Sequence, residues 1–252
     1  MAATLLACGG AALIAGAPDW LNHMALAQTP LTGSPDPTFS QDLSGLGHKF
    51  ELIGTAADAA DPRNPTNDVI ATTIAEGGSS SDPQFAGAIR PLPPGVDIAT
   101  LTDQLDLKYF FVDRTCGGGA PRFQLALDLD GDGVSDGNAF GYVGNPPNFT
   151  GCDLGRWRFE DLTDDLPRWD LSQFFARGLT VPPGSGFVVP WSVAVAAVEA
   201  FPNHRVLSGV LVDDTFPHSP STAGSPGGVG HAFYDLVTVD NRTLENRQDS
   251  VH

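Results

Sequence analysis

The pattern of hydrophobic and polar positions along this chain predicts many short β-strands. Between Arg122 and Leu129, large apolar residues alternate with polar or small ones, so one face of a strand is apolar. Similar short runs recur along the chain, separated by turns rich in Gly, Pro, Asn and Asp. The predicted strands are 48–55, 68–75, 104–114, 122–129, 156–160, 169–175, 205–212 and 231–240, with a further short apolar stretch at 85–89.

One stretch, 191–201, has a helical composition, and Pro202 directly after it predicts that the helix ends there. Many short strands, Gly/Pro turns and a single helix are typical of an all-β antiparallel β-sandwich. We prefer jelly-roll connectivity among the possible sandwich topologies. The sequence therefore predicts one β-sandwich domain over 48–252 with one short helix.

The turn after the strand at 122–129 concentrates acidic residues in the run DLDGDGVSD. Four carboxylates lie within nine residues, at Asp128, Asp130, Asp132 and Asp136. Like charges this close repel one another, and a bound cation neutralises them. Oxygen ligands at alternate positions suit Ca²⁺, with the carbonyl of Val134 as a fifth donor. The alternative is a solvated turn without a metal.

The start of this loop also fits the EF-hand pattern, but Ala139 stands at the twelfth position, where an EF-hand has a bidentate Glu. The flanking segments are predicted strands rather than helices. The loop resembles the D-x-D-x-D-G-x-x-D calcium loops of thrombospondin type 3 repeats and integrin-type propeller blades. That resemblance implies calcium and implies neither of those folds.

The last predicted strand belongs to the stretch GHAFYDLVTVDNRTL, residues 230–244. It is similar to the closing strand of jelly-roll carbohydrate-binding modules, which often carries a Tyr, an Asp, an Asn and a Val in close succession. Tyr234, Asp235 and Val237 match, and Leu236 replaces the Asn. The resemblance implies a secreted accessory module with a fold-stabilising calcium.

Residues 1–27 have the composition of an export segment rather than of part of the fold. Residues 1–17 are small and apolar, and an A-x-A cleavage site ends at Ala27. The apolar run is too short for a membrane span, and it lacks the preceding basic residues of an ordinary signal peptide. The run LLAC offers lipidation of Cys8 as an alternative. Residues 28–47 are rich in Pro, Ser and Gly, which predicts an extended or disordered segment.

Cysteine usage agrees with export. Without residues 1–27, Cys116 and Cys152 remain as a pair, which predicts a disulfide in an exported chain. A Cys/His zinc site is the alternative, but the close C-x-x-C spacing typical of zinc is missing.

The formal net charge of −17 changes the set of plausible partners. Such a surface repels nucleic acid and anionic lipid, and it favours divalent cations and neutral or cationic ligands. We expect a secreted or cell-surface protein with no nucleic-acid partner and no membrane span.

Aromatic residues in or beside the predicted strands are candidates for ligand binding, because sugar rings pack on aromatic planes. The candidates are Trp169, Tyr142 and Trp157, with burial of these rings in the core as the alternative. Trp169 lies near a turn, which favours exposure, whereas Trp157 alternates with Arg156 and Arg158, which favours burial.

Other polar groups have structural alternatives that we favour. The acidic residues between Glu160 and Asp165 are more typical of a solvated turn than of a second cation site, and Asp213 and Asp214 present the same choice. His204, His218 and His231 fit no metal motif. Asn148 and Asn241 begin N-x-[ST] sequons, whose use depends on the source of the protein.

Three functions remain open. The first is a calcium-stabilised extracellular binding module, with glycans as the expected ligands. The second is a structural or adhesive surface protein that associates with copies of itself by strand addition. The third is a secreted hydrolase or lyase built from loop carboxylates and histidines.

Overall fold

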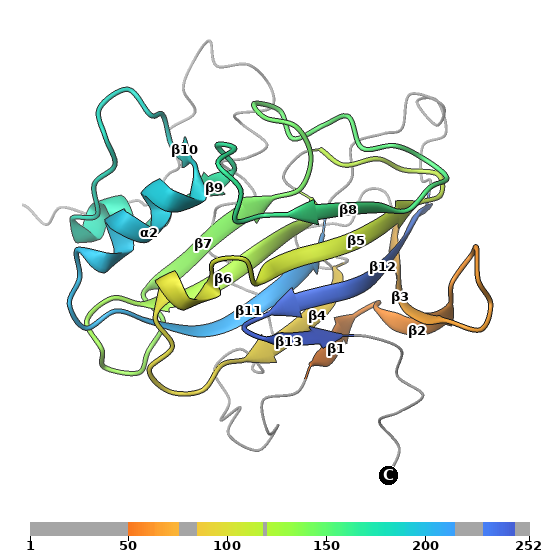
Figure 1. Cartoon of the computed structure of the whole chain (residues 1–252), viewed down its shortest axis with the longest axis horizontal. Coiled ribbons are helices and arrows are strands. Elements are labelled where there is room, and N and C mark those ends of the chain that lie inside the picture. Colours follow the sequence, from red (N-terminus) through yellow and green to blue (C-terminus); the bar gives the residue numbers. More distant parts are fainter. Residues whose placement is uncertain (1–49, 76–84, 118–119, 215–228, 245–252) are drawn as a thin grey trace, which may run out of the picture.

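The structure is a computed structural model in which residues 50–75, 85–117, 120–214 and 229–244 are described. The predicted segments 1–27 and 28–47, and His218, lie outside these residues. Two antiparallel β-sheets lie one over the other (Figure 1), with most of the apolar residues between them. The predicted all-β antiparallel sandwich is therefore confirmed, while jelly-roll connectivity stays a prediction.

Sheet A has seven strands in the order β1-β4-β11-β6-β7-β9-β10. Their bounds are β1 Glu51–Gly54, β4 Ala86–Pro91, β11 Arg205–Asp213, β6 Arg122–Asp128, β7 Gly137–Tyr142, β9 Trp169–Asp170 and β10 Val188–Val189. Sheet B has the order β2-β3-β12-β5-β8, and β13 also pairs with β12. Their bounds are β2 Ala57–Ala60, β3 Asp68–Ala75, β12 Val229–Val239, β5 Leu105–Phe111, β8 Arg158–Asp161 and β13 Arg242–Leu244.

The core follows from the alternation in the central strands. In β6, Phe123, Leu125 and Leu127 are fully buried, and in β5 Leu107 and Phe111 are as well. These side chains belong to one continuous apolar cluster between the sheets. Successive residues of a strand point to opposite faces, so the residues between them point away from this core.

The predicted helix is confirmed as α2, Trp191–Glu199, which lies beside the β9 and β10 end of sheet A (Figure 1). Trp191, Ala194 and Val198 are buried, so one side of the helix faces the core. The Trp191 ring lies 4.8 Å from the ring of Trp169, and its Nε1 donates a hydrogen bond to the Thr102 hydroxyl. The helix closes one end of the sandwich.

The predicted strand at 169–175 is wrong beyond its first two residues. Trp169 and Asp170 form β9 between β7 and β10. The Ser172 N–H then donates to the Asp170 carboxylate at 2.8 Å, and the chain turns into a 3-10 helix, η4, Ser172–Arg177. A second 3-10 helix, η3, spans Ile98–Leu101. The short strands β2, β10 and β13 were not predicted, because pairing with a neighbouring strand defines them more than an apolar pattern does.

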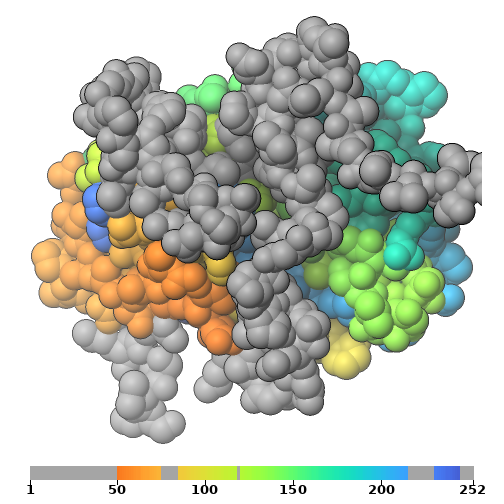
Figure 2. Space-filling model, turned by 180° about the vertical axis from the view of Figure 1, so that it is seen from behind, coloured from red at the N-terminus to blue at the C-terminus, as the bar shows by residue number. Residues whose placement is uncertain are grey.

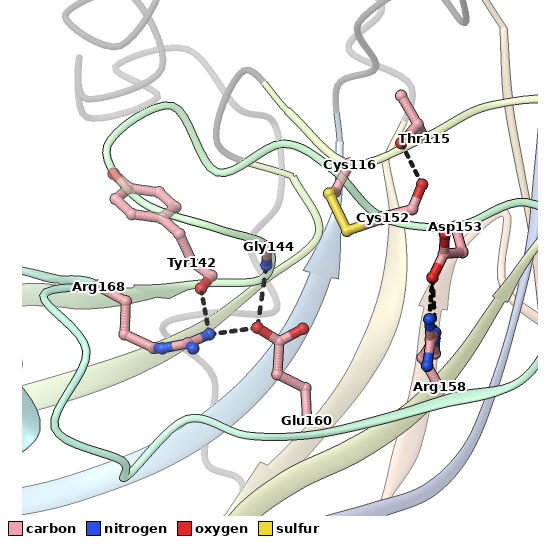
Figure 3. Close-up of a disulfide and its surroundings, with 9 residues drawn as sticks. All are labelled: Thr115, Cys116, Tyr142, Gly144, Cys152, Asp153, Arg158, Glu160 and Arg168. Carbon is pink, nitrogen blue, oxygen red and sulfur yellow. Dashed lines mark hydrogen bonds and ion pairs between the residues drawn. A yellow bond between two sulfur atoms is a disulfide. The ribbon is translucent and has the colours of Figure 1, made fainter.

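The predicted disulfide is present between Cys116 and Cys152, whose Cα atoms are 5.5 Å apart (Figure 3). Cys116 precedes β6 and Cys152 follows β7, so the bond joins the two ends of the β6–β7 hairpin. The Thr115 hydroxyl donates to the Cys152 carbonyl at 2.9 Å beside it. The hairpin that carries the acidic loop is thus held at its base by a covalent bond.

The helices within the described residues are all too short or too polar to cross a membrane.

Candidate metal site and aromatic surface

The acidic loop connects β6 to β7, beginning at Asp128 and ending at Asp136. The Asp136 N–H donates to the Leu127 carbonyl at 2.7 Å, which closes the hairpin around the loop. Asp128 is fully buried, whereas Asp130 and Asp132 are exposed. The loop lies at the surface, in light green at the lower right of Figure 2.

Backbone hydrogen bonds fix the carboxylates of the loop. Asp128 accepts the N–H of Gly131 at 2.6 Å on Oδ1 and that of Gly133 at 2.8 Å on Oδ2. Asp130 accepts the N–H of Asp132, and Asp132 accepts that of Val134 at 2.7 Å. Each aspartate therefore folds back on the turn that follows it.

This folding brings three carboxylates together. Oxygen atoms of Asp128, Asp130 and Asp136 all lie within 4.8 Å of one another, a group that could hold a metal ion. The donors are all oxygen, so the group suits a hard cation rather than a soft transition metal. Asp132 is outside this group, and its Oδ1 instead accepts the N–H of Val134. Of the five predicted ligands, the structure brings together these three.

Two arginines lie against the loop. Arg177 of η4 forms an ion pair with Asp136 Oδ1 at 2.5 Å, and Arg205 donates to the Gly131 carbonyl at 2.7 Å. Burial alone would raise the pKa of Asp128, but the N–H groups of Gly133 and Gly131 and the charge of Arg205 lower it below its ordinary value. The buried carboxylate is thus held in its ionised form, which is the form that binds a cation.

Two of the three predicted aromatic candidates are buried, which corrects the expectation that Trp169 is exposed. Trp169 is fully buried, and its Nε1 donates to the Leu162 carbonyl at 2.7 Å. Tyr142 is 4% exposed, and its hydroxyl donates to Asp170. The pairing of β9 on both of its edges places Trp169 inside the sandwich. Neither ring presents a face to a ligand.

The third candidate, Trp157, is half-buried and lies on the outer face of sheet B. Its ring centroid is 5.6 Å from that of Phe110, which in turn is 6.3 Å from that of Phe233. Phe110 and Phe233 are directly opposite each other in β5 and β12. All three residues lie outside the core clusters. They form a row of aromatic rings across the sheet.

Phe159 adds a fourth ring to this row. It lies opposite Lys108, two residues from Phe110, so it shares the outer face with the other rings. Phe159 is 60% exposed, the most exposed aromatic residue in the part of the chain that the structure describes. We call Trp157, Phe159, Phe110 and Phe233 the aromatic surface.

Polar contacts hold the aromatic surface in place. The Trp157 Nε1 donates to Asp61 Oδ1 at 3.1 Å, which fixes the indole. The Arg63 guanidinium lies 5.4 Å from the Phe110 ring and donates to the Gly155 carbonyl at 2.6 Å. Phe110 is covered by its neighbours and is 5% exposed. The rings that a ligand can reach are therefore those of Trp157, Phe159 and Phe233.

Sequence reasoning missed most of this surface, although a signal was present. Trp157 and Phe159 alternate with Arg156 and Arg158, and we expected the aromatic face of that strand to be buried. β8 is the edge strand of sheet B, so Arg158 reaches solvent and pairs with Asp153 (Figure 3) although it lies opposite the core residue Tyr109. The aromatic side is the one that faces away from sheet A.

The remaining charged candidates have structural partners. Arg168 pairs with Glu160 and with Asp164, and it donates to the Tyr142 carbonyl at 3.2 Å (Figure 3). Asp161 accepts the N–H of Thr163 at 2.8 Å. The His231 ring lies 2.8 Å from Asp113 and that of His204 lies 3.3 Å from Asp97, so the two described histidines are in separate pairs.

The two aspartates at the end of β11 also have basic partners. Asp213 pairs with Arg114 at 2.6 Å, and Asp214 pairs with both terminal nitrogens of Arg122. The sequons at Asn148 and Asn241 are exposed.

Comparison of the chain with protein-family models, with curated proteins and with solved structures finds no match in any of the three.

Proposed function

We propose that this protein is a secreted, calcium-stabilised binding module that takes glycans on the aromatic surface of sheet B. The observation that carries the proposal is the row of rings on the outer face of the sheet, with Trp157, Phe159 and Phe233 accessible. Sugar rings present C–H faces that pack on aromatic planes, and charged side chains beside the rings, such as Lys108, supply hydrogen bonds.

Calcium has a structural part in this proposal. Asp128, Asp130 and Asp136 hold the ion, and Asp132 and the Val134 carbonyl turn toward the ion when it binds. Because Asp128 is fully buried, an ion bound to it is linked to the core. The disulfide holds together the two strands of the same hairpin at its base. The disulfide also supports export to an oxidising compartment.

The strand edges disfavour self-association by strand addition, the second function that the sequence left open. The outermost strands are β1 and β10 in sheet A and β2 and β8 in sheet B. Each is four residues long or shorter, and β8 carries Arg158, Glu160 and Asp161. Short and charged edges are the features that prevent edge-to-edge pairing.

A recess among the described residues disfavours a hydrolase or lyase. It is lined by Asp58, Asp68, Val69, Ile70, Tyr234, Asp235 and Leu244 and has a volume of about 10 Å³. It contains no histidine, and it has room for about one water molecule rather than for a substrate.

The test is a glycan-array screen of the chain with calcium and with a chelator, followed by titration of any glycan that binds. Replacing Trp157 and Phe159 together with Ala removes two stacking planes, each worth about 0.5–1.5 kcal/mol, so we expect affinity to fall about fivefold or more. Phe175→Ala is the matched control, because Phe175 is 40% exposed but lies on η4, away from sheet B.

Melting curves of each variant establish that it is folded. If the wild-type chain binds no glycan, or if the control weakens binding as much as the double variant does, the aromatic surface is not the binding site.

A further inference from the structure

His231 lies on the outer face of sheet B, next to the aromatic surface. The Tyr234 hydroxyl of β12 donates to Asp213 of sheet A at 3.0 Å, so Tyr234 points into the sandwich. His231 and Phe233 differ from Tyr234 by odd steps along the strand, so both point outward. They are two residues apart on one face, a separation of about 6.8 Å at about 3.4 Å per residue. A ligand on Phe233 therefore lies within reach of His231.

Asp113 holds the His231 side chain in one orientation. Its Oδ1 accepts the backbone N–H of His231 at 2.7 Å, and its Oδ2 lies 2.8 Å from Nδ1 of the ring. An ionised carboxylate can only accept, so we assign the proton to Nδ1, which donates to it. Nε2 is then the acceptor on the other side of the ring. The side chain remains 46% exposed, so this nitrogen is accessible to a ligand.

The hydrogen-bonding capacity at this position is not used within the described part of the chain. Nε2 of His231 contacts no polar group of the described residues. Thr73 lies directly opposite His231 in β3 and is exposed, and its hydroxyl has no hydrogen-bond partner among the same residues. His204 differs, because its side chain is only 7% exposed and its Nδ1 lies 2.7 Å from the Phe201 carbonyl.

The accessible rings and His231 lie on different strands of sheet B. Phe159 belongs to β8 and Trp157 directly precedes it, whereas His231 belongs to β12, and β5 lies between these two strands (Figure 1). Two strand spacings of about 4.8 Å make roughly 10 Å. One pyranose ring covers about the area of one aromatic ring. A sugar unit stacked on Trp157 or Phe159 therefore does not reach His231, and a second unit is needed.

We propose that His231, held by Asp113, hydrogen-bonds the far end of a glycan that stacks on the aromatic surface, so that the site takes neutral oligosaccharides rather than single sugars. This inference rests on the proposed function. Nε2 accepts a hydrogen bond from a sugar hydroxyl, and the Thr73 hydroxyl lies beside it as a second polar group. The net charge of −17 disfavours acidic glycans. Because Asp113 already fixes the ring, little conformational freedom is lost on binding.

The test compares two variants that each keep half of the hydrogen bonding of His231. His231→Asn places its amide near the position of Nδ1, so it retains the contact with Asp113 and removes the outward group. His231→Gln extends the amide to about the position of Nε2, so it retains the outward group. Melting curves in the presence of calcium establish that both variants are folded.

The probe is an array of neutral glycans from monosaccharides to hexasaccharides, titrated with the full chain and calcium. We expect the wild-type chain to prefer oligosaccharides to monosaccharides. His231→Asn should lose about fivefold in affinity for the oligosaccharides, the effect of about one hydrogen bond, and His231→Gln should stay within about twofold of wild type.

Three results overturn this inference: equal or tighter binding of monosaccharides by the wild-type chain, unchanged oligosaccharide affinity in His231→Asn, or equal losses in the two variants. If the double variant of Trp157 and Phe159 still loses binding, the proposed function survives each of these results. A wild-type chain that binds no glycan on the array refutes the proposed function, and this inference with it.

Discussion

Arg177 contacts Asp136 at 2.5 Å, so one carboxylate of the acidic loop already has a cationic partner within the chain. The two residues belong to different elements, since Arg177 ends η4 and Asp136 closes the β6–β7 hairpin. Asp136 is also one of the three carboxylates that could hold a metal ion. If the loop binds calcium as we propose, Arg177 competes with the ion for Asp136.

Replacing Arg177 with Gln should strengthen calcium binding. Arg177 is 51% exposed, so the ion pair is worth at most about 1 kcal/mol, and we expect a gain in affinity of up to about fivefold. Calorimetric titration with calcium measures it. Arg156→Gln is the matched control, because Arg156 is similarly exposed and pairs with Asp153 outside the loop. Unchanged or weaker binding in Arg177→Gln would contradict the competition.

Calcium should raise the melting temperature of the whole sandwich. An ion that binds only the folded state stabilises it by about 3 kcal/mol at a hundredfold excess over Kd. Chelator should reverse the shift, and magnesium should reproduce it only in part, because it demands a regular octahedral cage.

The matching variants separate side-chain ligands from backbone ligands. Asp130→Ala should abolish most of the calcium-dependent shift, since it removes one carboxylate of the group. Val134→Ala should retain it, because the Val134 side chain is 65% exposed and only its carbonyl is a predicted ligand. If calcium does not change the melting temperature of the wild-type chain, the loop is a turn without a metal.

Arg114→Met should destabilise the fold by about 3–5 kcal/mol, because it leaves the buried Asp213 carboxylate without its ion pair. Asp213 also accepts the Thr72 hydroxyl at 2.6 Å and the Tyr234 hydroxyl, so it joins sheet A to sheet B. Adding Asp213→Asn removes the unpaired charge and should recover part of the loss. Urea unfolding of the single and double variants measures both effects, and equal stability of the two would refute the coupling.

Replacing Cys116 and Cys152 with Ser should lower the free energy of unfolding by about 4 kcal/mol, because the bond closes a loop of sequence separation 36. Denaturant titration with calcium present gives the value. A loss below about 1 kcal/mol would show that the hairpin is held by its other contacts. The same variant should bind calcium more weakly, since its hairpin is less constrained.

Asp170→Asn should stabilise the protein more at pH 7 than at pH 3. Burial raises the pKa of Asp170, although the Ser172 N–H and the hydroxyls of Ser172 and Tyr142 oppose the shift. The folded state therefore holds this proton more tightly than the unfolded state does. Its contribution to stability is highest below pH 3.8 and falls as the pH rises through that value toward the folded pKa. Melting temperatures of both proteins across pH 3–7 test this, and a difference that does not change with pH would contradict it.

The sequence by itself determined the class of the fold, the helix, the disulfide and the acidic loop. Each of these depends on residues that are close together in the chain, or on a pair of cysteines with no third cysteine in the predicted domain. Alternation gives a strand such as β6, and a run of small apolar residues before Pro202 gives α2. Cys116 and Cys152 are the pair that remains when the predicted export segment with Cys8 is set aside. The spacing of Asp128, Asp130 and Asp136 brings them together because the turns between them are local.

Only the tertiary structure decided which aromatic rings are exposed and how the two sheet faces differ. Trp169 is buried because β7 and β10 pair on both of its sides, and Trp157 is accessible because β8 is an edge strand. Arg177 reaches Asp136 although 41 positions of sequence separate them. Side-chain burial in a sandwich depends on which strand lies next to which and on what covers each sheet. Those are long-range pairings, and the local alternation of apolar residues is the same whichever face is covered.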